Sequence, residues 1–376
     1  MRIVFVGGAS GGHFYPLMAI AEGVLAYAKE HRHLVPELYY MGPDPYDEGS
    51  LFASGITFVY CPSGKNRRYS SFENIVDMFK AFWGVLIALG KLFYLYPDVI
   101  MSKGSHTSVP VVLAAWFLRI PIVIHESDAV PGRGNALAAR FAKYIAITYD
   151  ESAQFFPQEK IALTGIPVRT ELLAPAPPNA RALLGLQSDK PLILVLGGSQ
   201  GAERINNLLA TTLDALLPSF EIFHQTGTAH EYVTQETAKA LTTQKDLLKY
   251  YHVRGFLDIA TLHAAESEAT LVISRAGSGS IYETALHGKP SILIPIPEEI
   301  SHDQRKNAYA YARTGAGEVI EEKNLTPHLL VSEITRIMSS REVQEKMQAA
   351  ALLFGTKDAA ARIAEALMSI GHSHER

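Results

Sequence analysis

An apolar run that ends in paired glycines occurs twice in this chain. Ile3–Val6 leads into Gly7-Gly8, and Ile193–Leu196 leads into Gly197-Gly198. Each copy predicts a buried strand that turns sharply on glycine and enters a helix, a geometry that lets backbone N–H groups approach a bound phosphate. One copy alone would indicate little beyond a nucleotide site. Two copies so far apart predict two similar α/β domains that face each other across a cleft.

The bulk properties of the chain agree with two packed domains. A length of 376 residues suits two cores better than one, and a hydrophobic content of 48% predicts ordered interiors. The net charge of −4 argues against a nucleic-acid partner, which attracts basic surfaces. A single cysteine, Cys61, excludes an internal disulfide and fits a reducing compartment. The chain opens directly on a strand-like run, so we expect no secretion signal.

Short strand-like runs alternate with helix-length segments throughout. In the first half these runs are Ile3–Val6, Leu38–Met41, Thr57–Tyr60, Val99–Met101, Ile122–His125, Tyr144–Thr148 and Ile161–Leu163. In the second half they are Leu192–Leu196, Glu221–Gln225, Tyr251–Arg254, Leu271–Ser274 and Ser291–Pro295. Helices are predicted between them, for example over Pro16–Glu30, Val109–Arg119, Ile205–Leu217 and Ile281–His287. This order predicts two parallel sheets wrapped by helices, with ligands at the carboxyl ends of the strands.

The domain connection is predicted near a proline-rich segment at 174–179, which can continue neither a helix nor a central strand. Lys357–Ile370, whose apolar residues recur at helical spacing, predicts a last helix. This helix either ends the second domain or returns to brace the first, and its sequence is compatible with both.

One segment of the first half is unusually apolar. Ala81–Tyr96 contains little polarity beyond Lys91 and is shorter than the roughly 20 residues that span a bilayer. Basic residues at 65–68 and aromatic residues such as Phe72 and Phe79 precede it. The segment fits a buried helix packed on the sheet, and it also fits a patch that contacts an anionic membrane. Both interpretations hold if only one side of the helix is buried.

The first glycine loop, Gly7–His13, does not match two familiar nucleotide motifs. Ala9 stands where a dinucleotide motif requires glycine, and no acidic residue ends the second strand, so a dinucleotide site is disfavoured. The lysine-containing P-loop pattern is also missing from the sequence. His13 ends the loop and is predicted to act as a general base, since imidazole titrates near neutral pH. The alternatives are a plain strand-to-helix turn and a histidine that only caps the helix.

Two loops of the second half have the composition of a diphosphate site. Gly197–Ala202 repeats the glycine turn and adds the Ser199 hydroxyl. Ser274–Ser280 combines glycines, hydroxyls and Arg275 ahead of a predicted helix, whose N-terminus favours anions. Glu283 lies one helical turn further on, where a carboxylate can accept both hydroxyls of a ribose. Its simpler interpretation is a favourable charge near a helix N-terminus.

Two more polar runs follow predicted strands. Asp303, Gln304 and Asn307 would lie together on a helix and suit sugar hydroxyls, although a solvated helix start fits equally well. His125–Asp128 adds ionisable groups, including Glu126, to the ligand edge of the first sheet. No histidine or cysteine cluster in the sequence has zinc spacing and no Asp-x-Asp pair is suitably placed, so we predict no metal.

Together these loops resemble the MurG family of glycosyltransferases over nearly the whole chain. The resemblance rests on GGASGGH at 7–13, HESD at 125–128 with Asn135, GIPVR at 165–169, GGSQGAERIN at 197–206, HQTG at 224–227, SRAGSGSIYE at 274–283 and DQRKNA at 303–308. Members of this family transfer N-acetylglucosamine from UDP-GlcNAc to the lipid-linked muramyl-pentapeptide of peptidoglycan synthesis. The resemblance therefore implies an inverting, metal-independent transferase that needs no cofactor.

The resemblance also implies a fold and a role for each domain. The fold is GT-B, in which two Rossmann-like domains flank a deep cleft. Residues 1–165 would bind the acceptor, and a helix over 357–371 would pack back on them. Through this domain the protein would attach peripherally to the cytoplasmic face of the membrane. Residues 166–356 would bind UDP-GlcNAc.

Site residues carry over position by position. Those implied for the donor are Arg169, Ser199, Gln200, Gly201, Leu257, Arg275, Gly279, Ser280, Glu283, Asp303, Gln304 and Asn307. Among them, Glu283 would hold the ribose, Ser199 and Ser280 the diphosphate, and Gln304 the sugar. Those implied for the acceptor are Ser10, Gly11, Gly12, His106 and Asn135. His13 is the predicted base, and Glu126 is the next candidate.

The chain departs from the family pattern mainly on the acceptor side. Ala9 and Ser10 replace a Gly-Thr pair, Asp128 replaces an asparagine, and Ser105-His106 replaces a Gly-Tyr pair. The donor is therefore better defined than the acceptor.

Two other classes of function fit the same residues. One is a different enzyme on this scaffold, namely a UDP-GlcNAc epimerase or a diacylglycerol glycosyltransferase. The other is a catalytically silent subunit that only binds a nucleotide sugar. Turnover of UDP-GlcNAc with and without a lipid acceptor distinguishes these possibilities.

Overall fold

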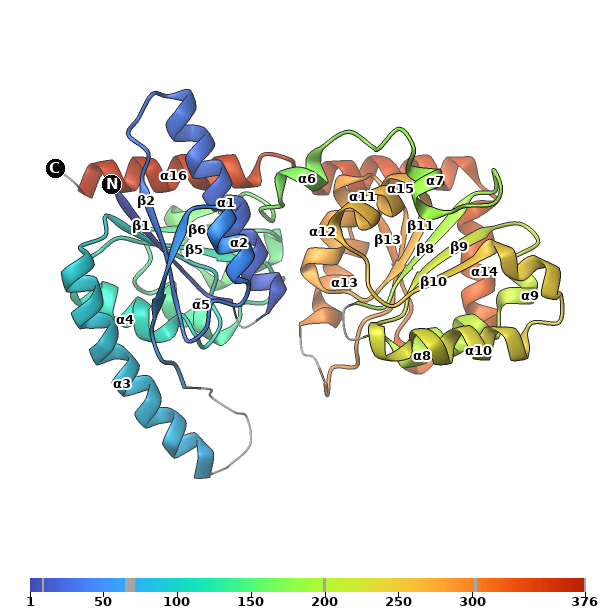
Figure 1. The fold of residues 1–376 in the computed structure, drawn as a ribbon, viewed down its shortest axis with the longest axis horizontal. Helices are drawn as coiled ribbons and strands as arrows, with labels where there is room; N and C mark the ends of the chain where they lie inside the picture. Colours follow the sequence, from blue (N-terminus) through green and yellow to red (C-terminus); the bar gives the residue numbers. More distant parts are fainter. Residues whose placement is uncertain (9, 65–71, 199–200, 301–302, 375–376) are drawn as a thin grey trace. The chain divides into compact units, whose positions relative to one another are not determined.

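The computed structural model describes residues 1–8, 10–64, 72–198, 201–300 and 303–374 (Figure 1). The chain divides into two compact units. The first combines Met1–Thr170 with Lys357–Arg376, and the second comprises Glu171–Thr356. Each unit is a parallel sheet covered by helices, so the predicted class of two Rossmann-like α/β domains is confirmed.

Over the described residues, the first unit has a seven-stranded parallel sheet in the order β3-β2-β1-β4-β5-β6-β7. The strands are β1 (Arg2–Val6), β2 (Glu37–Gly42), β3 (Ile56–Tyr60), β4 (Val99–Ser102), β5 (Ile122–Glu126), β6 (Tyr144–Ile147) and β7 (Ile161–Leu163). The chain runs outward from β1 to β3 and returns to the other side of β1, where Val6 pairs with Ser102. This reversal places the loops after β1 and β4 beside each other, which is where such sheets bind ligands.

Alternate residues of β1 build the two faces of the first core. Ile3 and Phe5 pack with residues of α1 (Gly11–Glu30) and α16 (Ala359–His374). Val4 and Val6 pack with residues of α3 (Phe72–Leu95) and α4 (Val109–Phe117). Because side chains alternate along a strand, one short strand anchors helices on both faces of the sheet. The shorter helices α2 (Glu48–Ala53) and α5 (Arg133–Ala138) belong to the same unit.

The last helix, α16, packs along α1 of the first unit (Figure 1). Ile363 and Leu367 of α16 join the core cluster that contains Leu17 of α1. Gly23 lies at the crossing, where a Cβ would be only 3.0 Å from the carbonyl oxygen of Ala360. The missing side chain of Gly23 therefore permits the close approach of the two helices.

The second unit repeats this topology with a six-stranded parallel sheet, again over the described residues, in the order β10-β9-β8-β11-β12-β13. Its strands are β8 (Leu192–Leu196), β9 (Glu221–Gln225), β10 (Tyr251–Arg254), β11 (Ala269–Ser274), β12 (Ser291–Leu293) and β13 (Gly317–Val319). Its helices include α7 (Ala180–Leu184), α8 (Glu203–Ala210), α9 (Leu213–Leu216), α10 (Glu231–Leu241), α11 (Ile259–Glu268), α12 (Ser278–Leu286), α13 (Gln304–Ala312), α14 (Pro327–Met338) and α15 (Arg341–Phe354), and α6 (Thr170–Leu173) lies where the units join. β8 occupies the place that β1 has in the first sheet and is buried along its whole length.

Some elements differ from the sequence prediction. The single helix predicted over Ile205–Leu217 is two helices, because the hydroxyls of Thr211 and Thr212 bond to carbonyls of the preceding turn and help to end α8. The strand predicted over Ser291–Pro295 ends at Leu293, ahead of a proline that cannot donate to the ladder. β13 is only three residues long and has too short an apolar run to be predicted.

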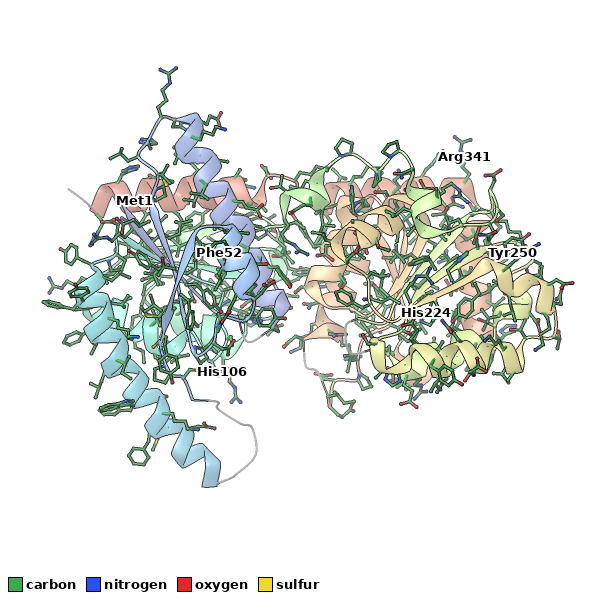
Figure 2. All side chains as sticks on the ribbon, viewed as in Figure 1. Met1, Phe52, His106, His224, Tyr250 and Arg341 are labelled. Atoms are coloured by element: carbon green, nitrogen blue, oxygen red, sulfur yellow. The ribbon has the colours of Figure 1, made fainter. Side chains whose placement is uncertain are left out.

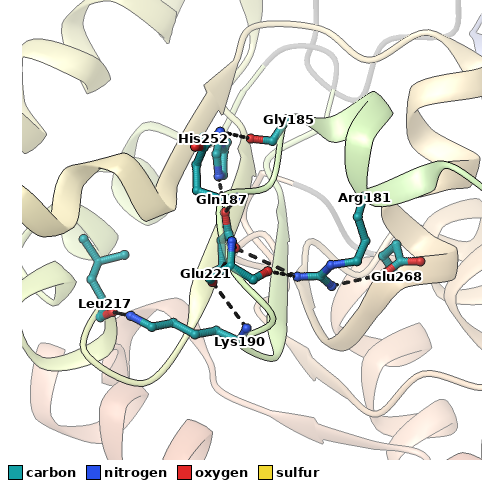
Figure 3. Close-up of polar contacts among 9 residues, drawn as sticks. Arg181, Gly185, Gln187, Lys190, Leu217, Glu221, His252 and Glu268 are labelled. Atoms are coloured by element: carbon teal, nitrogen blue, oxygen red, sulfur yellow. Dashed lines mark hydrogen bonds and ion pairs between the residues drawn. The ribbon is translucent and has the colours of Figure 1, made fainter.

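A buried carboxylate binds several groups at the amino-terminal ends of the strands of the second sheet, opposite the carboxyl ends where ligands bind (Figure 3). Glu221, at the start of β9, is fully buried. It accepts hydrogen bonds from the backbone N–H groups of Gln187 (2.6 Å) and Ser188 (3.1 Å), from the Ser188 hydroxyl (2.8 Å) and from His252 Nε2 (2.6 Å). Arg181 approaches to 4.0 Å. Burial opposes ionisation, but these hydrogen bonds outweigh it and lower the pKa of Glu221.

We expect Glu221→Ala to destabilise the second domain by about 3 kcal/mol, since it leaves several buried donors unpaired. Urea unfolding measures this change. Because the folded-state pKa of Glu221 is lowered, its contribution is present above the ordinary glutamate pKa and is lost as the pH falls through the folded-state value. Glu236→Ala is the matched control, since Glu236 makes only an exposed ion pair with Lys239 and should change stability by less than about 0.5 kcal/mol. Equal losses in the two variants would contradict this account.

Candidate functional site

The first glycine loop requires glycine for two separate reasons. Gly7 and Gly8 both have φ of +122°, a conformation that L side chains rarely adopt. A Cβ on Gly8 would also lie 2.3 Å from the Tyr40 hydroxyl. That hydroxyl donates to the Gly7 carbonyl at 2.5 Å and fixes the turn. The loop therefore leads into α1 with its first backbone N–H groups at the ligand edge of the sheet.

His13 lies in the first turn of α1 and is held by Ser10. The His13 Nδ1 atom is 2.8 Å from the Ser10 hydroxyl, while the backbone N–H groups of His13 and Phe14 both donate to the Ser10 carbonyl at 3.0 Å. If Nδ1 carries the proton, Nε2 is left with a lone pair. Burial, assisted by the positive charge of Lys103, lowers the pKa of His13 to about 4. The imidazole is then neutral at pH 7, as a general base requires.

Lys103 is a site residue that the sequence did not single out. It follows β4 directly, and its side chain is buried with its ammonium group hydrogen-bonded to the Ser127 hydroxyl. Burial lowers the pKa of Lys103, and the charges of Glu126 and Asp128 oppose that shift. The sequence feature that could have identified Lys103 is its position immediately after a fully buried strand, at the edge of the sheet where ligands bind.

Glu126 and Asn135 are bound to each other inside the first domain. The Glu126 carboxylate accepts from the backbone N–H groups of Asp128 (3.0 Å) and Gly132 (3.2 Å) and from Asn135 Nδ2 (3.0 Å). Asn135 Nδ2 also donates to the His125 carbonyl, and the residue is only 3% exposed. Burial and the nearby Asp128 raise the pKa of Glu126 to about 7. Both residues therefore shape the loop after β5, and Glu126 stays partly protonated near neutral pH.

His106 completes the polar groups around His13. It lies at the edge of the first domain (Figure 2), and its Nδ1 is 3.3 Å from the Ser105 hydroxyl. Ser105 has φ of +75°, which fits the glycine that the family pattern places there. The charges of Lys103, Asp128 and His106 all act on the pKa of His13, so these four side chains share one electrostatic environment.

Arg169 belongs to the first unit in this structure. Its guanidinium carbon lies 4.4 Å from the centre of the Tyr15 ring, a cation–π arrangement that holds the side chain beside the start of α1. Its predicted contact with a nucleotide stays a prediction.

The second glycine loop also requires glycine, most clearly at Gly201. Gly201 has φ of +79°, and a Cβ there would lie 2.3 Å from the Thr226 carbonyl oxygen. Ser199 and Gln200, which are predicted to bind the donor, lie outside the described residues.

The N-terminus of α12 has the features of an anion site. Its N-cap is Gly277, which provides no side-chain cap, and Ser278, Gly279 and Ser280 are half-buried around it. Unpaired N–H groups and the helix dipole favour a negative charge at such a point. Glu283 follows one turn later and is also half-buried. The predicted grouping of Gly279, Ser280 and Glu283 at one helix start is therefore confirmed, whereas their ligand roles stay predictions.

Arg275 is engaged by protein groups. It donates to the Ile294 carbonyl at 3.1 Å and pairs with the Glu322 carboxylate. It also lines an open pocket of about 690 Å³ together with Gly201 and Arg204. A diphosphate that binds Arg275, as predicted, would therefore compete with the Glu322 carboxylate for its guanidinium group.

The other predicted donor residues are exposed to different degrees. Gln304 Oε1 accepts from the backbone N–H groups of Ala276 (3.3 Å) and Ile296 (3.2 Å) and thereby joins two loops of the ligand edge. Asp303 occupies the N-cap position of α13 without a side-chain capping hydrogen bond and is half-buried. Asn307 is almost completely buried, so it does not share an accessible face with them as the helical spacing predicts. Leu257 is part of the hydrophobic core, which leaves only its backbone for a ligand.

Helix α3 has one buried and one exposed apolar face. Ala88 and Leu92 are buried in the core beside α4, while Met78, Phe79, Phe82, Trp83, Leu86, Phe93 and Tyr94 are exposed. The helix begins at Phe72 rather than at Ala81, and its segment Asp77–Leu95 is long and apolar enough to cross a membrane by length and composition alone. The interpretation in which only one side of this helix is buried is confirmed. The basic residues at 65–68 lie outside the described residues.

Comparison with known proteins identifies the family. The model of the glycosyltransferase family 28 N-terminal domain matches residues 3–147, and that of the C-terminal domain matches residues 192–363. The chain belongs to glycosyltransferase family 28. This family 28 chain is 36% identical over 344 residues to UDP-N-acetylglucosamine–N-acetylmuramyl-(pentapeptide) pyrophosphoryl-undecaprenol N-acetylglucosamine transferase 3 of Bacillus thuringiensis (strain Al Hakam), covering 91% of this chain and 92% of the relative. The transferase of the same name in Treponema denticola is 31% identical over 371 residues and 95% of both chains.

Solved structures confirm the GT-B fold of the family 28 chain. The crystal structure of MurG from Acinetobacter baumannii superposes with a TM-score of 0.74 at 24% identity, over 98% of this chain and 99% of that one. The UDP-GlcNAc 2-epimerase of Neisseria meningitidis superposes with a TM-score of 0.69 at 14% identity, over 98% and 100% of the two chains. Because transferases and epimerases share the architecture, the fold alone does not choose between them.

Proposed function

We propose that this family 28 chain transfers N-acetylglucosamine from UDP-GlcNAc to undecaprenyl-pyrophosphoryl-MurNAc-pentapeptide, giving the lipid-linked disaccharide of peptidoglycan synthesis. The observation that carries the proposal is the 36% identity to the Bacillus thuringiensis transferase over nine-tenths of both chains. The different surroundings of the two glycine loops support it. The first loop ends in His13, whose imidazole is neutral at pH 7, whereas the second domain has the N-terminus of α12, which no side chain caps.

In this proposal the second domain, Glu171–Thr356, holds the donor. The N-terminus of α12, with Gly279 and Ser280, takes the diphosphate, and Glu283 accepts the ribose hydroxyls. The same diphosphate binds Ser199, Gln200 and Gly201, and Arg275 contributes its positive charge. Asp303 and Gln304 at the start of α13 face the sugar. The helix end supplies the electrostatic stabilisation for the leaving UDP that a divalent cation provides in other transferases.

The first domain, Met1–Thr170 with the returning C-terminal helix, takes the acceptor. The residues proposed to contact the acceptor are Ser10, Gly11, Gly12 and His106. Asn135 supports the loop after β5 through its buried hydrogen bonds to His125 and Glu126. His13 Nε2 removes the proton from the acceptor hydroxyl while that oxygen bonds to the anomeric carbon. The bond to UDP breaks on the opposite side, and UDP leaves with the electron pair, which inverts the anomeric centre.

The pH profile of kcat/KM identifies the base. If His13 is the base, its pKa of about 4 predicts a flat profile between pH 5 and 8, since the imidazole is deprotonated throughout. If Glu126 is the base, its pKa of about 7 predicts that kcat/KM falls with decreasing pH below neutrality. We expect the flat profile, together with a loss of roughly 10²–10⁴-fold in kcat for His13→Ala. Near-normal turnover of that variant would remove His13 from the role.

We also propose that the protein works on the cytoplasmic side of the membrane as a peripheral protein, held by the exposed apolar face of α3. Trp83→Glu should lower partitioning onto anionic phospholipid vesicles by about tenfold or more, because it replaces an apolar contact with a like charge. Cosedimentation with vesicles measures the effect. Phe52→Glu on α2 is the matched control: Phe52 is 89% exposed, against 59% for Trp83, and belongs to the same domain but lies off this face (Figure 2). Equal losses in both variants would count against α3.

The decisive assay incubates the purified chain with UDP-GlcNAc in the presence and absence of the lipid-linked muramyl-pentapeptide. We expect a lipid-linked disaccharide and UDP only when the acceptor is present. Epimerised sugar without acceptor, transfer to diacylglycerol, or binding without turnover would each overturn the proposal in favour of a named alternative.

A further inference from the structure

The two helices that are proposed to hold the donor share an aromatic contact. Tyr282 lies on α12 between Ser280 and Glu283, Tyr311 lies near the end of α13, and both tyrosine side chains are fully buried. Phe354 is the last residue of α15, and its ring packs edge-on against both, with centroids 5.8 Å from Tyr282 and 5.0 Å from Tyr311. The end of α15 therefore contacts both α12 and α13.

The chain after Phe354 stays in contact with α12. A Cβ on Gly355 would lie 2.7 Å from the Leu286 backbone nitrogen and 2.8 Å from the Ala285 carbonyl carbon. These distances are too short for a side chain, so the glycine permits the two backbones to touch. The segment after α15 is thus held on α12 by backbone packing as well as by the aromatic rings.

The Tyr282 hydroxyl binds three groups of the next residue, Thr356. It is 2.9 Å from the Thr356 carbonyl oxygen and 2.9 Å from Thr356 Oγ1, and the Thr356 backbone N–H donates to it at 3.0 Å. Because a carbonyl oxygen only accepts, the single proton of the tyrosine hydroxyl goes to it, and Thr356 Oγ1 acts as a donor. One hydroxyl therefore fixes both the backbone and the side chain of Thr356. We call Tyr282, Phe354, Gly355 and Thr356 the α12 clasp.

The α12 clasp ends where the chain leaves the second unit. Thr356 is the last residue of that unit, and Lys357 is the first residue of the segment that returns to the first unit. One residue further on, the Asp358 carbonyl already accepts from the Arg362 N–H at 2.9 Å in the first turn of α16. Hydrogen bonds thus fix the backbone at Thr356 and again at Asp358, so the freedom of the chain at this crossing is concentrated at Lys357.

We propose that Tyr282 and Phe354 are positioning residues of the donor site, which couple the binding of a nucleoside diphosphate at α12 to the immobilisation of the chain beside Lys357. The inference rests on the proposed function, in which Ser280 and Glu283 hold the diphosphate and the ribose. These two residues flank Tyr282 on a helix of only nine residues. A ligand that restrains them also restrains Tyr282, which then holds Thr356 more persistently without a change in the average structure.

Such a coupling is reciprocal. If bound UDP makes the opening of the Tyr282–Thr356 contact rarer by some factor, the loss of that contact weakens UDP binding by the same factor. The coupling cannot exceed the net contribution of the contact itself. For one hydrogen bond that contribution corresponds to about fivefold in an equilibrium constant.

The first measurement is hydrogen exchange of the Thr356 amide in the full-length protein, since this N–H donates to the Tyr282 hydroxyl. Saturating UDP should slow this exchange about threefold to fivefold, because the contact opens less often. Titration calorimetry in the same buffer gives the Kd of UDP. Unchanged exchange at Thr356 in a protein that binds UDP would overturn the inference.

The sharpest variant is Tyr282→Phe, which removes the hydroxyl and keeps the ring against Phe354. The Kd of UDP should rise by the factor by which UDP slows exchange in the wild type, and exchange at Thr356 should no longer respond to UDP. Its kcat at saturating donor should stay near the wild-type value, so that the loss appears in the KM for UDP-GlcNAc. A variant that is less stable but keeps the wild-type Kd and the wild-type response to UDP would show a purely structural contact and overturn the inference.

Tyr309→Phe is the matched control. It removes another tyrosine hydroxyl of the same domain, one that donates to Glu321 at 2.9 Å rather than to the α12 clasp. Both the Kd of UDP and the exchange at Thr356 should stay at wild-type values. Equal changes in Tyr309→Phe and Tyr282→Phe would contradict a specific role of Tyr282.

Gly355→Ala tests the α12 clasp by a different route, because the added Cβ displaces the segment from α12 and leaves the Tyr282 hydroxyl in place. It should raise the Kd of UDP to a similar extent, and its combination with Tyr282→Phe should add little, since both changes break one contact. Fully additive losses would mean two independent effects and would count against the inference.

One comparison separates this inference from the proposed function. If Glu283→Ala weakens UDP binding while wild-type exchange at Thr356 does not respond to UDP, only the coupling is overturned. If the wild-type protein does not bind UDP, the donor assignment fails and the coupling fails with it.

Discussion

The complete burial of the two central strands determines where everything else in this protein lies. Ile3–Val6 in β1 and Ile193–Val195 in β8 have no exposed surface, because each strand has helices on both faces. Each buried strand ends in a glycine turn, and an added Cβ would collide with neighbouring groups at Gly8 in the first turn and at Gly197 and Gly201 in the second. The start of the next helix and the neighbouring loops therefore lie at the same edge of each sheet. The hydrophobic core thus fixes the position of the polar chemistry.

The duplicated framework carries two different electrostatic arrangements. In the first domain a buried ammonium, Lys103, lies near His13 and helps to keep that imidazole neutral. In the second domain the corresponding loop leads to the N-terminus of α12, whose N-cap Gly277 provides no side-chain cap. Its unpaired N–H groups and helix dipole favour a negative charge. This difference suits a proton acceptor on one side and an anion site on the other.

Sequence alone predicted the parts of this structure that depend on local pattern. The strands, the two glycine turns and the grouping of Ser280 with Glu283 follow from apolar runs and short spacings, and the structure has them. The sequence alone did not predict contacts between residues that lie far apart in the chain. The Arg275–Glu322 pair and the His263–His287 contact each join separate elements, and no local pattern marks them. Asn307 was placed on an accessible face by helical spacing, but tertiary packing buries it.

Hydrogen bonding distinguishes two buried carboxyl groups of the second domain. Glu221 is as buried as Glu266, yet it accepts four hydrogen bonds and has a lowered pKa, whereas Glu266 accepts none from the described residues and has a raised one. A carboxylate that is fully hydrogen-bonded stabilises the fold. One that is buried without such bonds costs stability, and packing alone gives no reason to retain it. The raised pKa of Glu266 reduces this cost, because it favours the neutral form of the carboxyl group, which burial penalises least.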